Sequence, residues 1–148
     1  MYRVSYQAFK AALLSRGKND HRPYLNAFHF DSEGFIISTD GHRLFCGKAD
    51  TNCAETITVD VLGKEPSKFD YAEISTNIAN FYSDESGLLC SLPVRVIDQP
   101  YPDWRGVTRF NEGNVSAIGF TGTYLSDVVK PTKIYGLKVV KMEFQDNT

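Results

Sequence analysis

The alternation of apolar and polar side chains at the start of the chain predicts a short strand followed by a helix. Residues 2–4 have the pattern of a brief strand, and Ser5 is a suitable N-cap for the helix that follows. Gly17 is a natural C-terminal cap for this helix. The apolar side chains that we expect on its buried face recur at helical spacing: Tyr6, Phe9, Ala12 and Leu13.

Beyond the helix, the pattern changes to strands separated by turns. Residues 31–34 have turn chemistry, and Asp40-Gly41 marks a second turn. Pro93 interrupts the last of the strands, which predicts either an edge strand or a bulge at that point. The expected strands are residues 24–30, 35–38, 44–46, 55–61, 71–75 and 88–97.

The carboxyl-terminal part predicts a loop, a helix and a final strand. Residues 110–114 are loop-like, and residues 121–130 form a predicted helix that Pro131 stops. Residues 134–144 alternate as a strand with a change of phase near Val139, which predicts a bulge or a break. The whole pattern favours an α+β fold, with an antiparallel sheet and two helices. The second helix is expected to be buried through Leu125, Val128 and Val129.

Composition narrows this picture to one domain. A chain of 148 residues with 42% hydrophobic side chains can bury roughly 70% of the surface that its unfolded form exposes. We therefore expect a single domain over residues 1–148. The amino terminus is too polar for a signal peptide, and no run approaches the length that spans a bilayer. A cytoplasmic protein is expected, with its cysteines reduced: Cys46, Cys53 and Cys90.

The net charge of −2 conceals a segregation of charge, because residues 1–30 carry +4 and residues 31–110 carry −6. The basic segment has the chemistry of a nucleic-acid contact, since cations displace counterions from phosphates and aromatic rings stack on unpaired bases. A solvated helix face explains the same residues equally well. The candidate group is Lys10, Arg16, Lys18, Arg22 and Tyr24.

Catalytic chemistry is not favoured. Ser38, Asp40 and His42 lie two residues apart, so on a strand they project side by side and do not converge as a triad requires. A turn anchored by Asp40 is the preferred interpretation. The other histidines, His21 and His29, belong to no cluster with the spacing of a metal site. We expect no enzyme activity, no cofactor and no metal.

Two segments have the features of a protein-binding surface. Residues 39–44 place Gly41, which exposes its backbone, beside His42 and Arg43 and then return to apolar Leu44. Residues 101–107 combine aromatic, proline and aliphatic side chains, and prolines lower the entropy lost on binding. Such mixed walls are typical of a peptide groove. A pair of well-packed turns is the alternative from composition alone.

Three stretches carry a resemblance to a known family, the bacterial DNA polymerase III beta subunit or sliding clamp. Arg22-Pro23-Tyr24-Leu25-Asn26 resembles the family's Arg-aromatic-Tyr-Leu-Asn stretch. Thr39-Asp40-Gly41-His42-Arg43-Leu44 matches its most recognisable motif, and Tyr101-Pro102-Asp103-Trp104-Arg105 is similar to the segment that closes its middle domain. The likeness spans about residues 3–107, and residues 108–148 then correspond to a second-helix and terminal-strand region.

The resemblance implies a DNA-clamp-like fold that captures short linear motifs of replication or repair proteins without chemistry of its own. It raises the expectation that the basic segment lies near duplex DNA. This chain departs from the family, because clamps have three such domains, because residues 63–67 form a loop where a helix is expected, and because the family's carboxyl-terminal tail is absent. The implied peptide-binding residues are Leu25, Thr39, Gly41, His42, Arg43, Leu44, Pro102 and Val107.

Three functions remain open at this point. The first is a minimal clamp, of the kind a phage would encode, which tethers replication partners and contacts DNA as a ring-sized homo-oligomer. The second is a free-standing adaptor or decoy with a clamp-type peptide pocket that neither forms a ring nor binds DNA. The third, an enzyme on the same scaffold, is the least favoured because no site meets the geometric requirements.

Overall fold

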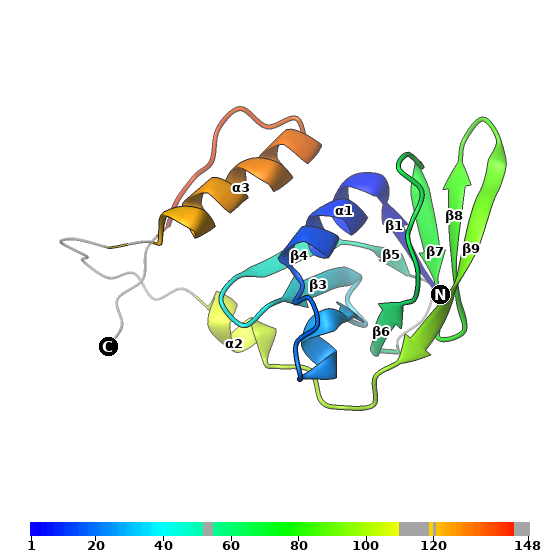
Figure 1. Cartoon of the computed structure of the whole chain (residues 1–148), viewed down its shortest axis with the longest axis horizontal. Helices are drawn as coiled ribbons and strands as arrows, with labels where there is room; N and C mark the ends of the chain where they lie inside the picture. Colours follow the sequence, from blue (N-terminus) through cyan, green and yellow to red (C-terminus); the bar gives the residue numbers. More distant parts are fainter. Residues whose placement is uncertain (52–54, 110–118, 120, 144–148) are drawn as a thin grey trace. The chain divides into compact units, whose positions relative to one another are not determined.

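The computed structural model describes residues 1–51, 55–109, 119 and 121–143. The chain divides into two compact units, Met1–Tyr101 and Pro102–Thr148, and each is described by itself. The first unit holds a large antiparallel sheet and a helix, and the second holds two helices (Figure 1). The predicted α+β class with an antiparallel sheet is therefore confirmed. The prediction of one domain over residues 1–148 stays a prediction.

The sheet of the first unit has nine strands in the order β4-β3-β2-β6-β9-β8-β7-β1-β5, and every neighbouring pair is antiparallel. The two ends of this order, β4 and β5, are separated in the chain by Ala49 alone, so the sheet curls until its edges meet. The strands are β1 (Tyr2–Ser5), β2 (Phe28–Phe30), β3 (Phe35–Thr39), β4 (Leu44–Lys48), β5 (Asp50–Thr51), β6 (Ile57–Val61), β7 (Tyr71–Ile74), β8 (Ile78–Ser83) and β9 (Gly87–Val96).

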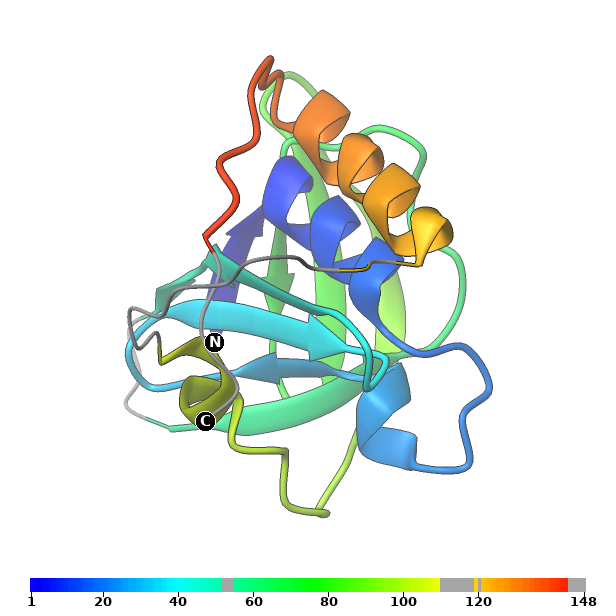
Figure 2. The same cartoon turned by 90° about the vertical axis from the view of Figure 1, so that its left-hand side faces the viewer.

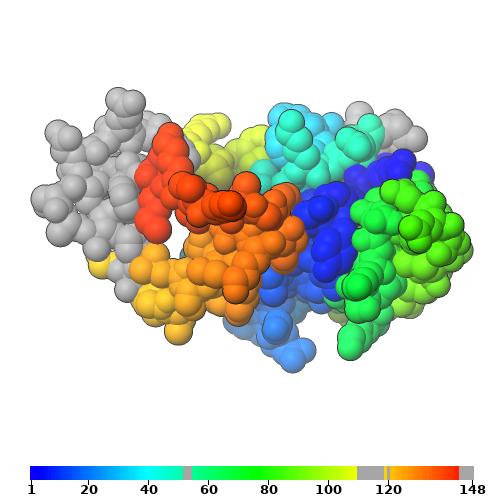
Figure 3. Space-filling model, turned by 90° about the horizontal axis from the view of Figure 1, so that it is seen from above, coloured from blue at the N-terminus to red at the C-terminus, as the bar shows by residue number. Residues whose placement is uncertain are grey.

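Helix α1 (Tyr6–Ser15) lies across the curled sheet (Figure 2). Its N-cap is Ser5, whose side chain accepts a hydrogen bond from the Ala8 amide. The buried face of α1 contacts β3 and β4 in one half of the sheet and β1 and β7 in the other. From above, its outer face reaches the surface between strands of the two halves (Figure 3). One helix thus closes the concave side of the sheet.

The core between α1 and the sheet is built around aromatic rings. The ring centroid of Phe9 lies 5.0 Å from that of Phe28, 5.7 Å from that of Phe69 and 5.3 Å from that of Phe81. All four side chains are buried. Truncating one such ring to alanine typically costs about 3–5 kcal/mol of stability. This cluster therefore fixes α1, and with it the chain that leaves its carboxyl end.

The sequence pattern locates α1 and most strands, but several of its details are wrong. Residues 23–26 form a 3₁₀ turn, η1 (Pro23–Asn26), because Pro23 starts a helical turn more readily than a strand. Gly17 does not take the left-handed conformation of a C-terminal cap, and its amide instead donates to the Leu25 carbonyl oxygen over 2.7 Å. Strands β5 and β8 were not predicted.

Pro93 lies inside the longest strand and is not at an edge of the sheet. Strand β9 pairs with β8 up to Pro93 and with β6 from Val94 onward, so the proline marks the point where β9 passes between neighbours. A proline is tolerated there because its missing amide falls at the change of partner. The register shift in this ladder lies elsewhere, between Phe81 and Tyr82 of β8.

The second unit contains α2 (Trp104–Thr108) and α3 (Gly122–Ile134). The prediction that Pro131 stops the second helix is wrong, because α3 continues through it to Ile134 and the Pro131 carbonyl oxygen still accepts from the Tyr135 amide over 3.0 Å. The expected burial of Leu125, Val128 and Val129 is also wrong, since all three are exposed.

The last predicted strand, residues 134–144, is not formed between 134 and 143: α3 ends there and Gly136 turns the backbone with φ +66°. The predicted loop at 110–114 lies outside the described residues. In the part of the chain that the structure describes, no helix has the length and apolar character needed to cross a bilayer.

Candidate functional site

The turn between β3 and β4 is held almost entirely by its own side chains. Asp40 Oδ1 accepts hydrogen bonds from the amides of His42 (2.9 Å) and Arg43 (3.0 Å). Thr39 Oγ1 donates to the Arg43 carbonyl oxygen over 2.6 Å and accepts from the Gly41 amide over 3.0 Å. Short polar side chains that bond the backbone two or three residues on are what makes such turns rigid.

Gly41 is the point of this turn at which the backbone itself is exposed. Its φ of +91° lies in the region that favours glycine. A side chain placed there would meet Arg22 Nη2 at 3.6 Å and Leu25 Cδ1 at 3.9 Å. The motif at residues 39–44 thus faces two residues of the motif at residues 22–26, although the two motifs are separate in the sequence.

The first motif, residues 22–26, contains η1 and is held in place by contacts with Gly17 and Asp20. Leu25 is buried, with 2% of its surface exposed, and its carbonyl oxygen accepts from the Gly17 amide. Arg22 makes a two-point contact with Asp20, from Nε over 3.0 Å and from Nη2 over 3.1 Å. The hydrogen bonds from Arg22, through its side chain and its backbone, lower the pKa of Asp20 from 3.8 to about 2.

Tyr101 brings the third motif to the other two. Its ring stacks on His29 with the centroids 4.3 Å apart and an interplanar angle of 9°, and it meets Tyr24 edge to face at 6.5 Å. Its hydroxyl is shielded from solvent and has no hydrogen-bond partner among the described residues. Burial raises the pKa of Tyr101 well above its usual value, and the Thr39 backbone offsets part of this rise.

These contacts define a three-motif cluster in the first unit: Tyr24, Leu25, Thr39, Gly41 and Tyr101. Its members come from η1, from the β3–β4 turn and from the end of the unit. Comparison of the chain with protein-family models and with curated protein sequences finds no match. The likeness to the clamp family therefore rests on the three sequence motifs alone and stays an expectation.

The predicted peptide-binding residues differ in how far a partner can reach them. Gly41 and His42 are exposed, Arg43 and Leu44 are half-buried, and Leu25 and Thr39 are buried. Leu25 and Thr39 therefore support the surface more than they form it. The remaining two, Pro102 and Val107, belong to the second unit and are exposed there.

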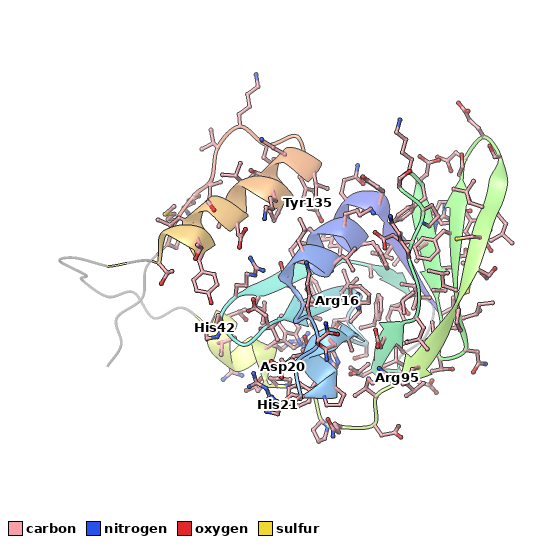
Figure 4. The ribbon with its side chains drawn as sticks, in the orientation of Figure 1. Arg16, Asp20, His21, His42, Arg95 and Tyr135 are labelled. Atoms are coloured by element: carbon pink, nitrogen blue, oxygen red, sulfur yellow. The ribbon has the colours of Figure 1, made fainter. Side chains whose placement is uncertain are left out.

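Arg43 contributes to the architecture of the turn. Its Nε forms an ion pair with Asp40 Oδ2 over 3.1 Å, and its Nη2 donates to the Leu14 carbonyl oxygen over 3.1 Å. The second bond ties the turn to the last part of α1. The Arg43 guanidinium therefore orients the residues around it. His42, at the tip of the turn, is more accessible than Arg43 (Figure 4).

Three of the four predicted DNA-contacting cations are engaged with carboxylates. Lys10 forms an ion pair with Glu65, and Arg22 pairs with Asp20. Arg16 Nη1 donates to the Asn26 carbonyl oxygen over 2.8 Å and to Asp60 Oδ1 over 3.2 Å. Lys18 is exposed and forms no ion pair with a described residue. Pairing lowers the net positive field that this segment presents to a polyanion.

Sequence reasoning missed the residues that connect the motifs. Arg95 shares Asp60 with Arg16, its Nη2 lying 2.7 Å from Asp60 Oδ2. His29 Nδ1, at the edge of the imidazole ring, lies 2.8 Å from Thr58 Oγ1, and the Tyr101 ring stacks on the face of His29. Tyr101 was quoted as part of a motif but not as a site residue. Its position before Pro102 was the available signal, since the residue before a proline is extended and held in place.

The side chains of Ser38, Asp40 and His42 do not converge as a catalytic triad. Ser38 is fully buried and its hydroxyl donates to the Ala12 carbonyl oxygen over 2.7 Å, whereas Asp40 bonds the turn backbone and His42 is exposed. Among the described residues, no group of three His, Cys, Asp or Glu side chains is placed to hold a metal ion.

Proposed function

We propose that this chain is a non-enzymatic, sliding-clamp-like protein that captures short clamp-binding peptides of DNA replication or repair proteins. The proposed contact surface is the β3–β4 turn, with Gly41 and His42 at its tip and Leu44 at its apolar side. The observation that supports this proposal best is the meeting of three motifs, separated by long stretches of sequence, in one cluster. A clamp-like fold is part of the same proposal.

The physical argument is one of preorganisation. Binding a flexible peptide costs less when the receptor surface is already ordered, because fewer rotamers and backbone angles are lost on the receptor side. The turn meets this condition, since Thr39 and Asp40 bond its backbone from within and Arg43 ties it to α1. The exposed backbone at Gly41 offers hydrogen-bonding groups, and Leu44 offers apolar area beside them.

The test is the affinity of the whole chain for a fluorescein-labelled peptide of the Gln-x-x-Leu-Phe type. We expect His42→Ala to weaken binding by about fivefold or more, the effect of losing a central contact. The matched control is His21→Ala, because His21 is an exposed histidine outside the proposed surface (Figure 4). No binding by the natural chain, or an equal loss in the control, would contradict the proposal.

A second candidate is favoured by the ion pairs of the basic segment. Because Lys10, Arg16 and Arg22 are held by carboxylates, the chain has a weaker electrostatic attraction for DNA than its sequence implies. This supports a free-standing adaptor or decoy that keeps the peptide surface and neither encircles nor binds DNA. The two candidates share the peptide and differ in oligomeric state and in DNA affinity.

A further inference from the structure

We propose that Asp20 is a positioning residue of the peptide surface, which holds the Arg22 guanidinium beside the exposed backbone of Gly41. This inference rests on the proposed function and deepens it, because it gives the loop between α1 and η1 a part in peptide capture (Figure 4). A Cβ placed on Gly41 would have Arg22 Nη2 as its nearest atom outside the turn, at 3.6 Å. Arg22 therefore borders the exposed Gly41 backbone.

The carboxylate of Asp20 fixes the direction of the Arg22 guanidinium. Asp20 Oδ1 accepts from the Arg22 amide over 2.9 Å and from Nε over 3.0 Å, and Oδ2 accepts from Nη2 over 3.1 Å. A planar guanidinium bound along one edge by both oxygens of a carboxylate cannot turn away without breaking two hydrogen bonds together. The Arg22 side chain stays 43% exposed, so a peptide can reach it while Asp20 holds it.

Asp20 is itself fixed by hydrogen bonds that lead back to the sheet. Its amide donates to Asn26 Oδ1 over 3.0 Å, and its carbonyl oxygen accepts from Asn26 Nδ2 over 2.8 Å. The Asn26 carbonyl oxygen accepts from Arg16 Nη1 over 2.8 Å, and the same Nη1 donates to Asp60 Oδ1 on β6 over 3.2 Å. The place of the Arg22 guanidinium is thus set by the fold and not by free rotation of a long side chain.

Asp20→Asn tests this role, because its amide nitrogen would face Arg22 Nη2 with two donors opposed, and the two-point contact is lost. We expect affinity for the same fluorescein-labelled peptide to fall by about threefold to fivefold, since the released guanidinium must be ordered again on binding. The melting temperature should change little, because an exposed ion pair contributes little to stability. The matched control is Asp50→Asn, which makes the same charge change at an exposed residue of β5.

A double-mutant cycle shows whether Asp20 acts through Arg22. Arg22→Lys keeps the positive charge but cannot form the two-point contact with a carboxylate. We expect Arg22→Lys to weaken peptide binding by a similar factor, and Asp20→Asn to add less than about 1.5-fold in that background. Full multiplication of the two effects would overturn the proposal, because Asp20 would then act independently of Arg22.

Proton exchange at Arg22 Nε provides a readout that needs no peptide. This proton is held against Asp20 Oδ1, so its exchange with water should accelerate by about fivefold or more in Asp20→Asn and remain unchanged in Asp50→Asn. A merely structural role would instead lower the melting temperature and accelerate amide exchange throughout the sheet. If the carboxylate acted only as a charge, Asp20→Asn would bind the anionic labelled peptide more tightly, and that result would also overturn the proposal.

The two proposals fail in different ways. If the natural chain does not bind the peptide, the proposed function is wrong and the positioning role falls with it. If the natural chain binds, but Asp20→Asn binds equally well or leaves the Arg22 Nε proton as protected as before, the positioning role alone is wrong. A loss of affinity in Asp20→Asn and Arg22→Lys that is absent from Asp50→Asn, together with faster exchange at Arg22 Nε, supports it.

Discussion

At the scale of single residues, the candidate site depends on one glycine and one carboxylate whose roles are distinct. Gly41 is required for its backbone angle, because φ +91° strains any side chain even where space is open. Asp20 is required for its charge, because it holds Arg22 beside Gly41. The backbone strain at Gly41 does not depend on pH, whereas the Asp20–Arg22 ion pair does.

Gly41→Ala is expected to destabilise the chain by about 1–2 kcal/mol, because the added Cβ disfavours a positive φ. Chemical denaturation measures this loss. Gly122→Ala is the control, since Gly122 has an ordinary φ, open space around it and a place in a helix. A Gly41→Ala protein as stable as the natural chain would show that the turn adopts another conformation.

The pKa of Asp20 makes a pH-dependent prediction. Because the folded pKa of about 2 lies below the ordinary 3.8, the stabilisation by the Asp20–Arg22 pair is present above pH 3.8 and is lost as the pH falls toward 2. Carbon NMR of the Asp20 carboxyl should show a midpoint near 2. Arg22→Gln should move it back toward 3.8, and an unmoved midpoint would assign the shift to another group.

At the scale of elements, the site depends on how α1 is joined to the strand that carries the turn. Ser38 of β3 donates to the Ala12 carbonyl oxygen of α1, and Arg43 at the end of the turn donates to that of Leu14. The Leu14 carbonyl lies in the last turn, where helix carbonyls lack an amide partner within the helix, and the Ala12 carbonyl accepts from the Arg16 amide as well as from Ser38. Helix and turn therefore form one rigid part.

Ser38→Ala removes the buried member of this pair of bonds. We expect a loss of about 1 kcal/mol in the free energy of unfolding, because the Ala12 carbonyl loses its side-chain donor and keeps only the Arg16 amide. Ser86→Ala is a matched control on the exposed loop between β8 and β9 and should change stability by less than about 0.5 kcal/mol. Equal effects of the two substitutions would show that the Ser38 hydrogen bond does not help to join β3 to α1.

At the scale of the whole molecule, the open question is whether the chain works as a ring or as a free-standing module. A ring needs several copies and a cationic inner surface, and three of the four predicted DNA-contacting cations are in ion pairs. Peptide capture needs neither several copies nor a cationic surface. The oligomeric mass and the response of DNA binding to salt therefore divide the two candidates.

We expect sedimentation at micromolar concentration to give a monomer or small oligomer, and DNA binding to be weak with a shallow salt dependence, because few free cations release few counterions. Lys18→Ala should reduce any residual DNA affinity more than Lys10→Ala does, since Lys10 is already paired with Glu65. A ring-sized mass with a steep salt dependence would favour the clamp over the adaptor.

The sequence predicted those parts of the fold whose signals are local. The start of α1 was predicted because Ser5 bonds the amide three residues on. Strand β6 was predicted because apolar and polar side chains alternate in its sequence, and strand β3 because its residues are β-prone and follow a turn. Strand β8 was missed because Asn80 and Ile78 weaken its pattern, and it is stabilised by pairing with β7 and β9 on both sides. Helix α3 continues past the expected stop because a proline keeps its carbonyl oxygen, which accepts from the Tyr135 amide in the next turn.

By itself, the sequence determined the turn at residues 39–44, because all the hydrogen bonds within that turn join residues no more than four apart. Only the tertiary structure decided what surrounds it. Lys10 meets a carboxylate 55 residues away and Arg16 one 44 residues away, and Tyr101 stacks on a histidine of the second strand. No spacing in the sequence encodes such pairs, since they depend on how the curled sheet and α1 bring distant segments together.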